Sequence, residues 1–174
     1  LSGLVGSEMC IRDSYKNWAF GRWEKVLASC PDIPVFQIGS ASDYKLPGAD
    51  HRLMGSTLNN SIALISNSSL HMGVDSFTNH LTNIKWRGKG QTPSVILWGS
   101  TQWQAAGYPH NNNISLGLEC QPCFREDPKI SGTPRGVCIN PPGQEDYDHP
   151  CHACMTGISV EMVTEAVRKM WDAE

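Results

Sequence analysis

The sequence of 174 residues has no long apolar run, no strong excess of charge of either sign and no recognisable targeting segment at its start. A transmembrane helix needs about 20 consecutive apolar residues, so no membrane span is expected. The formal net charge of −3 argues against a polyanionic partner, and we expect no nucleic acid. A signal peptide would need a basic segment and a longer apolar run than Leu1–Gly6 provides.

The sequence also has no internal repeat and no boundary that would divide it into two domains. Hydrophobic residues make up 40% of the chain, which is enough apolar mass for one core. Residues 1–14, LSGLVGSEMCIRDS, stand apart, because SEMCIRDS resembles the translated adapter read-through found at the ends of environmental gene fragments. We interpret this segment as a non-native tail, with a genuine N-terminal tail as the alternative, and place one domain at residues 15–174.

Short apolar runs alternate with amphipathic segments along the rest of the chain. The apolar runs predict buried strands, and apolar residues spaced three and four positions apart predict helices. We expect strands at 34–39, 52–55, 70–74, 93–99 and 114–118, and helices at 18–28, 57–67, 76–84 and 159–171. This alternation is typical of parallel βαβ units, so we predict an α/β fold with a Rossmann-like parallel sheet and flanking helices.

The turn after the strand at 70–74 has polar residues that suit a binding site. Asp75 follows Val74 directly, Ser76 comes next and His80 lies four residues later. In an open parallel sheet, ligands bind outside the carboxyl ends of the strands. The Asp75 carboxylate and the N–H groups of the next helix would share one crevice, where they suit sugar hydroxyls and an anion. The structural alternatives are an ordinary N-cap for Asp75 and a purely structural role for His80.

Five of the seven cysteines lie in a segment rich in Pro and Gly, at about residues 120–155, which we predict to be a loop. Cys120 and Cys123 form one C-x-x-C pair, Cys151 and Cys154 form a second, and Cys138 is a spare ligand. Two paired-thiolate hooks have the spacing of a structural zinc site, and zinc would order a loop that has no core of its own. Free thiols and disulfides remain alternatives, and no catalytic metal is predicted.

Two motifs in order, GVDSFTNHLT and PSVILWGST, resemble the paired signature of glycosyltransferase family 9, the ADP-heptose:lipopolysaccharide heptosyltransferase family. KNWAFGRWEKVL, from Lys16, resembles the K-x-W-x4-W segment that opens the C-terminal half of that family, and the likeness extends over about residues 15–170. The positions that match the paired signature are Gly73, Asp75, Ser76, His80, Pro93, Gly99 and Thr101.

The resemblance implies a GT-B fold, with two Rossmann-like domains and a cleft between them, of which this chain is the C-terminal, donor-binding one. It implies that Lys16 contacts the donor diphosphate, since a lysine suits phosphate as a point charge. Ser76 and the Phe77 amide would cradle the phosphates, and Asp75 would hold hydroxyls of the donor sugar. His80 would lie beside the diphosphate. The far wall of the crevice would be closed by Gly99, Ser100 and Thr101.

By the same resemblance the donor is a nucleoside diphosphate sugar, with ADP-heptose as the family default. The acceptor is a glycan or lipid-linked lipopolysaccharide precursor, bound mainly by the N-terminal domain. The family's catalytic base lies in that domain, so we expect this chain to bind the donor without turnover and without a cofactor. The expected location is the cytoplasm, including the inner face of the bacterial inner membrane. Phe77 stands where the family has glycine, which leaves the donor sugar open.

A second class of function remains open from the residues alone. The chain could be a non-catalytic Rossmann-like module whose zinc knuckle binds a partner, and it would then contain stoichiometric zinc and have no affinity for nucleotides. The segment Tyr108-Pro109-His110 reads as a turn, with contact to a base or ribose as the alternative.

Overall fold

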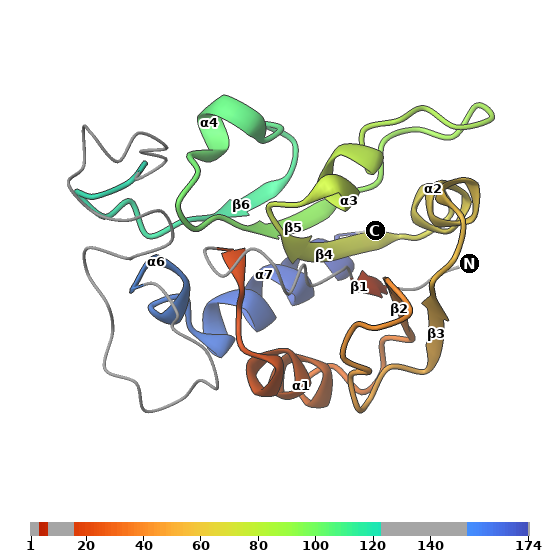
Figure 1. Cartoon of the computed structure of the whole chain (residues 1–174), viewed down its shortest axis with the longest axis horizontal. Coiled ribbons are helices and arrows are strands. Elements are labelled where there is room, and N and C mark those ends of the chain that lie inside the picture. The colour runs from red at the N-terminus through yellow and green to blue at the C-terminus, as the bar shows by residue number, and fades with distance from the viewer. Residues whose placement is uncertain (1–3, 7–15, 123–152, 174) are drawn as a thin grey trace.

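The computed structural model describes residues 4–6, 16–122 and 153–173. Within these residues the strands form one sheet in the order β3-β2-β1-β4-β5-β6, and every neighbouring pair is parallel (Figure 1). The sheet confirms the predicted α/β class. The strands are β1 (Leu4–Gly6), β2 (Val35–Gly39), β3 (His51–Met54), β4 (Leu70–Val74), β5 (Ser94–Leu97) and β6 (Asn112–Ile114).

Helices cover both faces of this sheet (Figure 1). On one face lie α1 (Phe20–Ala28) and α7 (Val160–Trp171), which pack against each other. On the other face lie α2 (Leu58–Ser66) and α3 (Phe77–Leu81). The short helix α4 (Trp103–Ala106) follows β5, and the short helix α6 (Ala153–Thr156) directly precedes α7. Because both faces are covered, β4 and β5 are buried along their whole length, as their continuous apolar runs predict.

The strand β1 differs from the sequence-based expectation, which left residues 1–14 out of the fold. Leu4–Gly6 lies between β2 and β4, with Leu4 in register with Val35 on one side and Leu70 on the other. A strand in this position completes the backbone hydrogen bonding of two parallel strands that would otherwise face each other across a gap. The non-native origin of residues 1–14 stays a prediction.

Local side-chain hydrogen bonds set one end of each of three helices. The Thr57 hydroxyl accepts from the amide of Asn60 at 3.3 Å and caps the N-terminus of α2. The Ser159 hydroxyl caps α7 by accepting from the amide of Met162 at 3.2 Å. The helix predicted at 76–84 ends at Leu81, because the Thr82 hydroxyl donates to the Asn79 carbonyl at 2.7 Å and competes with the helical pattern.

Two smaller expectations were wrong. The strand predicted at 114–118 is β6, which spans Asn112–Ile114 and pairs with β5. The cysteine-rich segment, predicted to be a loop as far as residue 155, contains α6 at its end. No helix among the described residues is long and apolar enough to cross a membrane.

Candidate functional site

The carboxyl end of β4 presents a buried acid beside a lysine. The Asp75 amide donates to the Leu97 carbonyl at 3.1 Å, which extends the β4–β5 pairing by one residue and fixes the acid at the rim of the sheet. Asp75 is only 5% exposed. The Lys16 ammonium lies 2.8 Å from one carboxylate oxygen of Asp75. Two residues that lie 59 positions apart by number, and that the sequence predicts to bind different parts of a donor, are therefore direct neighbours.

This ion pair leaves donor and acceptor capacity for a ligand. The second oxygen of Asp75 has no hydrogen-bond partner among the described residues, and the Lys16 ammonium has Asp75 alone as a partner there. The Lys16 side chain is 24% exposed, so the ammonium can be reached from solvent while it compensates the buried carboxylate. The pair can thus offer a positive charge to a phosphate and a carboxylate oxygen to a sugar hydroxyl at one place.

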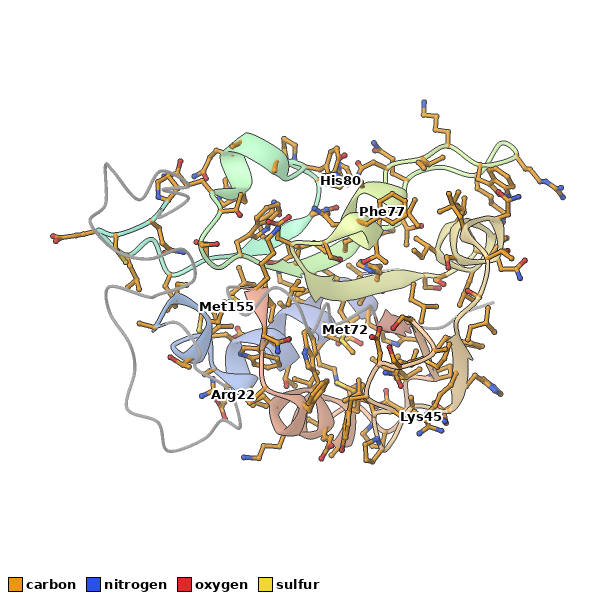
Figure 2. All side chains as sticks on the ribbon, viewed as in Figure 1. Arg22, Lys45, Met72, Phe77, His80 and Met155 are labelled. Atoms are coloured by element: carbon orange, nitrogen blue, oxygen red, sulfur yellow. The ribbon has the colours of Figure 1, made fainter. Side chains whose placement is uncertain are left out.

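The residues after Asp75 form the start of α3. The hydroxyls of Ser76 and Thr78 lie 2.9 Å apart, and Ser76 makes no side-chain cap on the helix. Phe77, where the family pattern has glycine, is 54% exposed and points its ring away from the core (Figure 2). With only five residues, α3 has a weak dipole.

His80 lies on the exposed side of α3 and contacts the turn after α4. Its Nδ1 lies 3.0 Å from the hydroxyl of Tyr108, and the two rings meet edge to face with centroids 5.9 Å apart. The Nε2 of His80 has no hydrogen-bond partner among the described residues. The sequence predicts His80 as a site residue and Tyr108 as part of a turn, with contact to a base or ribose as the alternative, so the contact between the two residues is a result of the tertiary structure.

Residues 99–101, which follow β5, lie at the carboxyl end of the sheet beside the end of β4. Ser100 is buried, and the hydroxyl of Thr101 is buried without a hydrogen-bond partner among the described residues. The Gly99 carbonyl accepts from the side-chain amide of Gln121, whose own carbonyl accepts from the amide of Leu118 at 2.7 Å. Gln121 therefore fastens the beginning of the cysteine-rich segment to the end of β5. The sequence offers no signal for this role, because an isolated glutamine in a polar loop is usually solvated.

Hydrogen bonds from Trp18 and Arg22 hold the chain where the cysteine-rich segment ends. The indole N–H of Trp18 donates to the Ile158 carbonyl at 3.0 Å, and Trp18 is fully buried. The Arg22 guanidinium donates to the carbonyls of Thr156 and Ile158 at 2.6 and 2.7 Å, and it lies over the Trp18 ring. Since Trp18 follows Lys16 by two residues, these hydrogen bonds also fix the backbone that carries Lys16 to Asp75.

The predicted metal ligands fall partly outside the described residues. Cys123, Cys138 and Cys151 lie there, so the C-x-x-C pairs have one described member each. Cys120 is partly exposed, and Cys154 is buried in α6 against the apolar core. Among the described residues no group of three metal-ligating side chains comes together. The zinc site therefore stays a prediction.

Comparisons with known proteins place this fold. No protein-family model and no curated protein matches the sequence. The chain is similar in structure to TibC of enterotoxigenic E. coli, a dodecameric iron-containing heptosyltransferase whose structure holds ADP-D-β-D-heptose, with a TM-score of 0.68 and 16% identity. It is similar to a family 9 glycosyl transferase from Veillonella parvula, with a TM-score of 0.68 and 16% identity. It is also similar to the ADP-heptose lipopolysaccharide heptosyltransferase II of E. coli, with a TM-score of 0.64 and 14% identity.

These similarities extend over 99% of this chain but over only 46–47% of the three proteins. The chain thus spans just under half the length of each of them. At such low identity the likeness concerns the arrangement of strands and helices, and it confirms the fold that the motifs GVDSFTNHLT and PSVILWGST indicate. This chain therefore has the fold of just under half of these glycosyltransferases.

Proposed function

We propose that this chain is the donor-binding part of a metal-independent GT-B glycosyltransferase, and that it binds a nucleoside diphosphate sugar at the carboxyl edge of its sheet. ADP-heptose is the first candidate donor, because two of the similar proteins are named as heptosyltransferases and one of them was solved with that sugar nucleotide. The transfer itself would need a catalytic base and an acceptor site from an N-terminal domain outside this chain.

The observation that carries this proposal is the pair formed by Lys16 and Asp75. An isolated ion pair at the rim of a sheet is weak evidence for stability, because removing two charges from water costs about as much as their attraction returns. The pair instead joins the two functions that a sugar nucleotide needs, a cation for the diphosphate and a carboxylate for sugar hydroxyls. It lies at the carboxyl end of β4, on the edge where open parallel sheets bind ligands.

The neighbouring residues extend the proposed site. Ser76 supplies a hydroxyl, and Phe77, two residues after Asp75, supplies a backbone amide and an exposed ring. His80 offers Nε2 toward solvent from the same short helix. A departing nucleoside diphosphate develops negative charge, which fixed N–H groups and a lysine stabilise electrostatically. The Gly99–Thr101 segment would bound the opposite side.

Calorimetric titration of the chain with ADP, GDP and UDP tests the proposal. We expect one nucleotide to bind at micromolar to millimolar concentration, and Lys16→Ala to weaken it about 10-fold or more, as the loss of a charge-assisted contact does. Asp75→Ala should weaken the sugar nucleotide more than the free nucleotide, because the carboxylate is proposed to hold the sugar. Absence of binding to a folded sample would refute the proposal.

Two control variants separate binding from folding. Lys89→Ala removes an exposed lysine from the loop before β5, which lies at the amino end of the strands. This variant should leave the affinity for the nucleotide unchanged. Asp75→Asn keeps the size of the side chain while removing the charge that balances Lys16. If Lys89→Ala weakens the nucleotide as much as Lys16→Ala, binding is a general charge effect and the proposed site is wrong.

The cysteine-rich segment is proposed to hold a structural metal through Cys120, Cys123, Cys151 and Cys154, with zinc as the sequence-based choice. The similar protein TibC is described as iron-containing, so both metals are to be measured by elemental analysis of the purified chain. We expect about one equivalent of one metal, lost in Cys123→Ser together with thermal stability. A metal-free sample with unchanged stability would refute this part of the proposal.

A further inference from the structure

Hydrogen bonds and close packing hold the turn that carries Tyr108. The Tyr108 carbonyl accepts from the side-chain amide of Asn113 at 2.9 Å and from the backbone amide of Asn111 at 3.1 Å. Asn113 in turn accepts from the indole N–H of the buried Trp98 at 2.9 Å. Gly107, directly before Tyr108, packs so closely that an added Cβ would lie 2.8 Å from the Trp98 ring. The tyrosine is thus fixed to the ends of β5 and β6.

A side-chain hydrogen bond also connects this turn to α3, at the residue before His80. The side-chain amide of Asn111 donates to the side-chain carbonyl of Asn79 at 3.1 Å, and both residues are buried. Asn79 directly precedes His80 in the chain. The hydroxyl of Tyr108 and the Nδ1 of His80 therefore meet between two segments that this hydrogen bond links, although His80 is exposed and Tyr108 is partly exposed.

We infer that Tyr108 is a positioning residue for His80, and that it makes the imidazole a hydrogen-bond donor toward a diphosphate. This inference rests on the proposed function. A phenol hydroxyl is a stronger donor than acceptor, so a neutral imidazole 3.0 Å away is favoured as the acceptor at Nδ1, which leaves the ring proton on Nε2. When the ring is protonated, both nitrogens carry protons and the phenol oxygen accepts from Nδ1. In either state the free Nε2 donates, which is the polarity that an anionic phosphate requires.

The alternative tautomer would work against binding. With the proton on Nδ1, Nε2 would present a lone pair to the phosphate oxygens, and one contact would turn from attractive to repulsive. When the ring is protonated, the same hydroxyl accepts from Nδ1, so the hydrogen bond is kept in both charge states. Phenylalanine would keep the edge-to-face ring contact but would no longer favour one neutral tautomer over the other.

The test compares Tyr108→Phe with the wild-type chain by nitrogen NMR of ¹⁵N-histidine-labelled protein, with His80→Gln to assign the signals. We expect neutral His80 to carry its proton mainly on Nε2 in the wild type and to show a mixture of tautomers in Tyr108→Phe. The affinity for ADP should fall about 3- to 10-fold in Tyr108→Phe, as for the loss of one neutral hydrogen bond. Combined with His80→Gln, Tyr108→Phe should cause no further loss.

Tyr44→Phe is the matched control, because the Tyr44 hydroxyl donates to the Glu24 carboxylate at 2.9 Å at a similarly exposed place on another part of the surface. It should change neither the His80 signals nor the affinity. An unchanged tautomer in Tyr108→Phe would overturn the inference. If the wild type binds no ADP, the proposed function fails, and the NMR result still decides whether Tyr108 orients the imidazole.

Discussion

The two faces of the sheet are packed with different kinds of residue. On the side of α1 and α7, the buried cluster is almost wholly apolar and includes Leu70, Met72, Val95 and Leu97 from the central strands. On the side of α2 and α3, the apolar cluster is small, with Ile38, Ile62, Ile65 and Leu81 as its buried members. Polar residues fill much of the rest of that side, among them His71, Asn79, Thr82, Thr92 and Ser94.

This difference separates stability from positioning. The apolar face stabilises the fold through burial, which has no directional requirement. The polar face uses hydrogen bonds with defined geometry, such as the one from the Thr92 hydroxyl to the Ile65 carbonyl at 2.8 Å. The candidate site grows out of the polar face, since α3 carries His80 and is linked through Asn79 to the Tyr108 turn. Three predictions test this difference between the two faces, and they follow in order of decreasing expected effect on stability.

The largest effect is expected on the apolar face. Leu97→Ala removes a side chain that is 1% exposed and should lower the free energy of unfolding by about 2–5 kcal/mol, because the cavity only partly collapses. Leu58→Ala is the matched control, since Leu58 is 52% exposed and its removal should cost less than about 1 kcal/mol. Urea denaturation followed by circular dichroism measures both. Equal losses in the two variants would contradict the assignment of this face as the stabilising one.

An intermediate effect, dependent on pH, is expected on the polar face. His71 is fully buried, its two ring nitrogens have no hydrogen-bond partner among the described residues, and burial lowers its pKa from 6.5 to about 3. The unfolded chain therefore binds a proton that the folded chain rejects, and stability falls as the pH drops from about 6.5 toward 3. The contribution of His71 at pH 4.5 should be about 2–3 kcal/mol of lost stability.

His71→Leu removes this titration. The variant should lose less stability than the wild type between pH 7 and pH 4.5, by denaturation at a series of pH values. His110→Leu is the control, because His110 is an exposed histidine. A pH dependence that is the same in His71→Leu and the wild type would show that another group causes the acid sensitivity.

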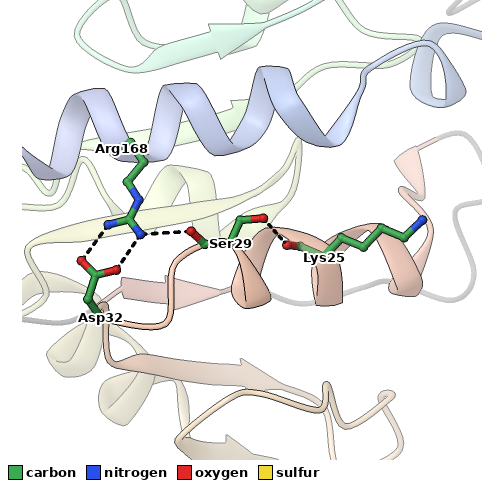
Figure 3. A network of polar contacts seen from close by, with 4 residues as sticks. All are labelled: Lys25, Ser29, Asp32 and Arg168. Atoms are coloured by element: carbon green, nitrogen blue, oxygen red, sulfur yellow. Dashed lines mark hydrogen bonds and ion pairs between the residues drawn. The ribbon is translucent and has the colours of Figure 1, made fainter.

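The smallest effect is expected at the surface, beyond the apolar face. Arg168 of α7 makes a two-pronged ion pair with Asp32, at 2.7 and 2.5 Å, and also donates to the Ser29 carbonyl at 3.0 Å (Figure 3). This contact holds the pKa of Asp32 below its usual value. The pair is open to solvent and screened by salt, so Arg168→Met should shift the denaturation midpoint far less than Leu97→Ala does. A shift of similar size that persists at about 1 M salt would contradict this.

The sequence predicts much of the fold because its signals are local. Val35–Gly39, Leu70–Val74 and Ser94–Leu97 are mainly apolar runs, and they form strands within two residues of the predicted bounds. The caps at Thr57 and Ser159 depend on a hydroxyl and an amide three residues apart, which a sequence displays directly. The end of α3 and the place of β6 were missed, since they depend on competing side-chain bonds and on pairing with a distant strand.

By itself, the sequence indicated the fold class and a short list of candidate site residues, because the residues that make up each signal lie within a few positions of one another along the chain. Only the tertiary structure decided which residues meet. It placed Lys16 on Asp75, Tyr108 on His80, Gln121 on Gly99 and Arg22 on the turn before α7. The physical reason is that these contacts join separate segments of the chain, and their geometry is fixed by the packing of helices on the two faces of the sheet rather than by any local preference.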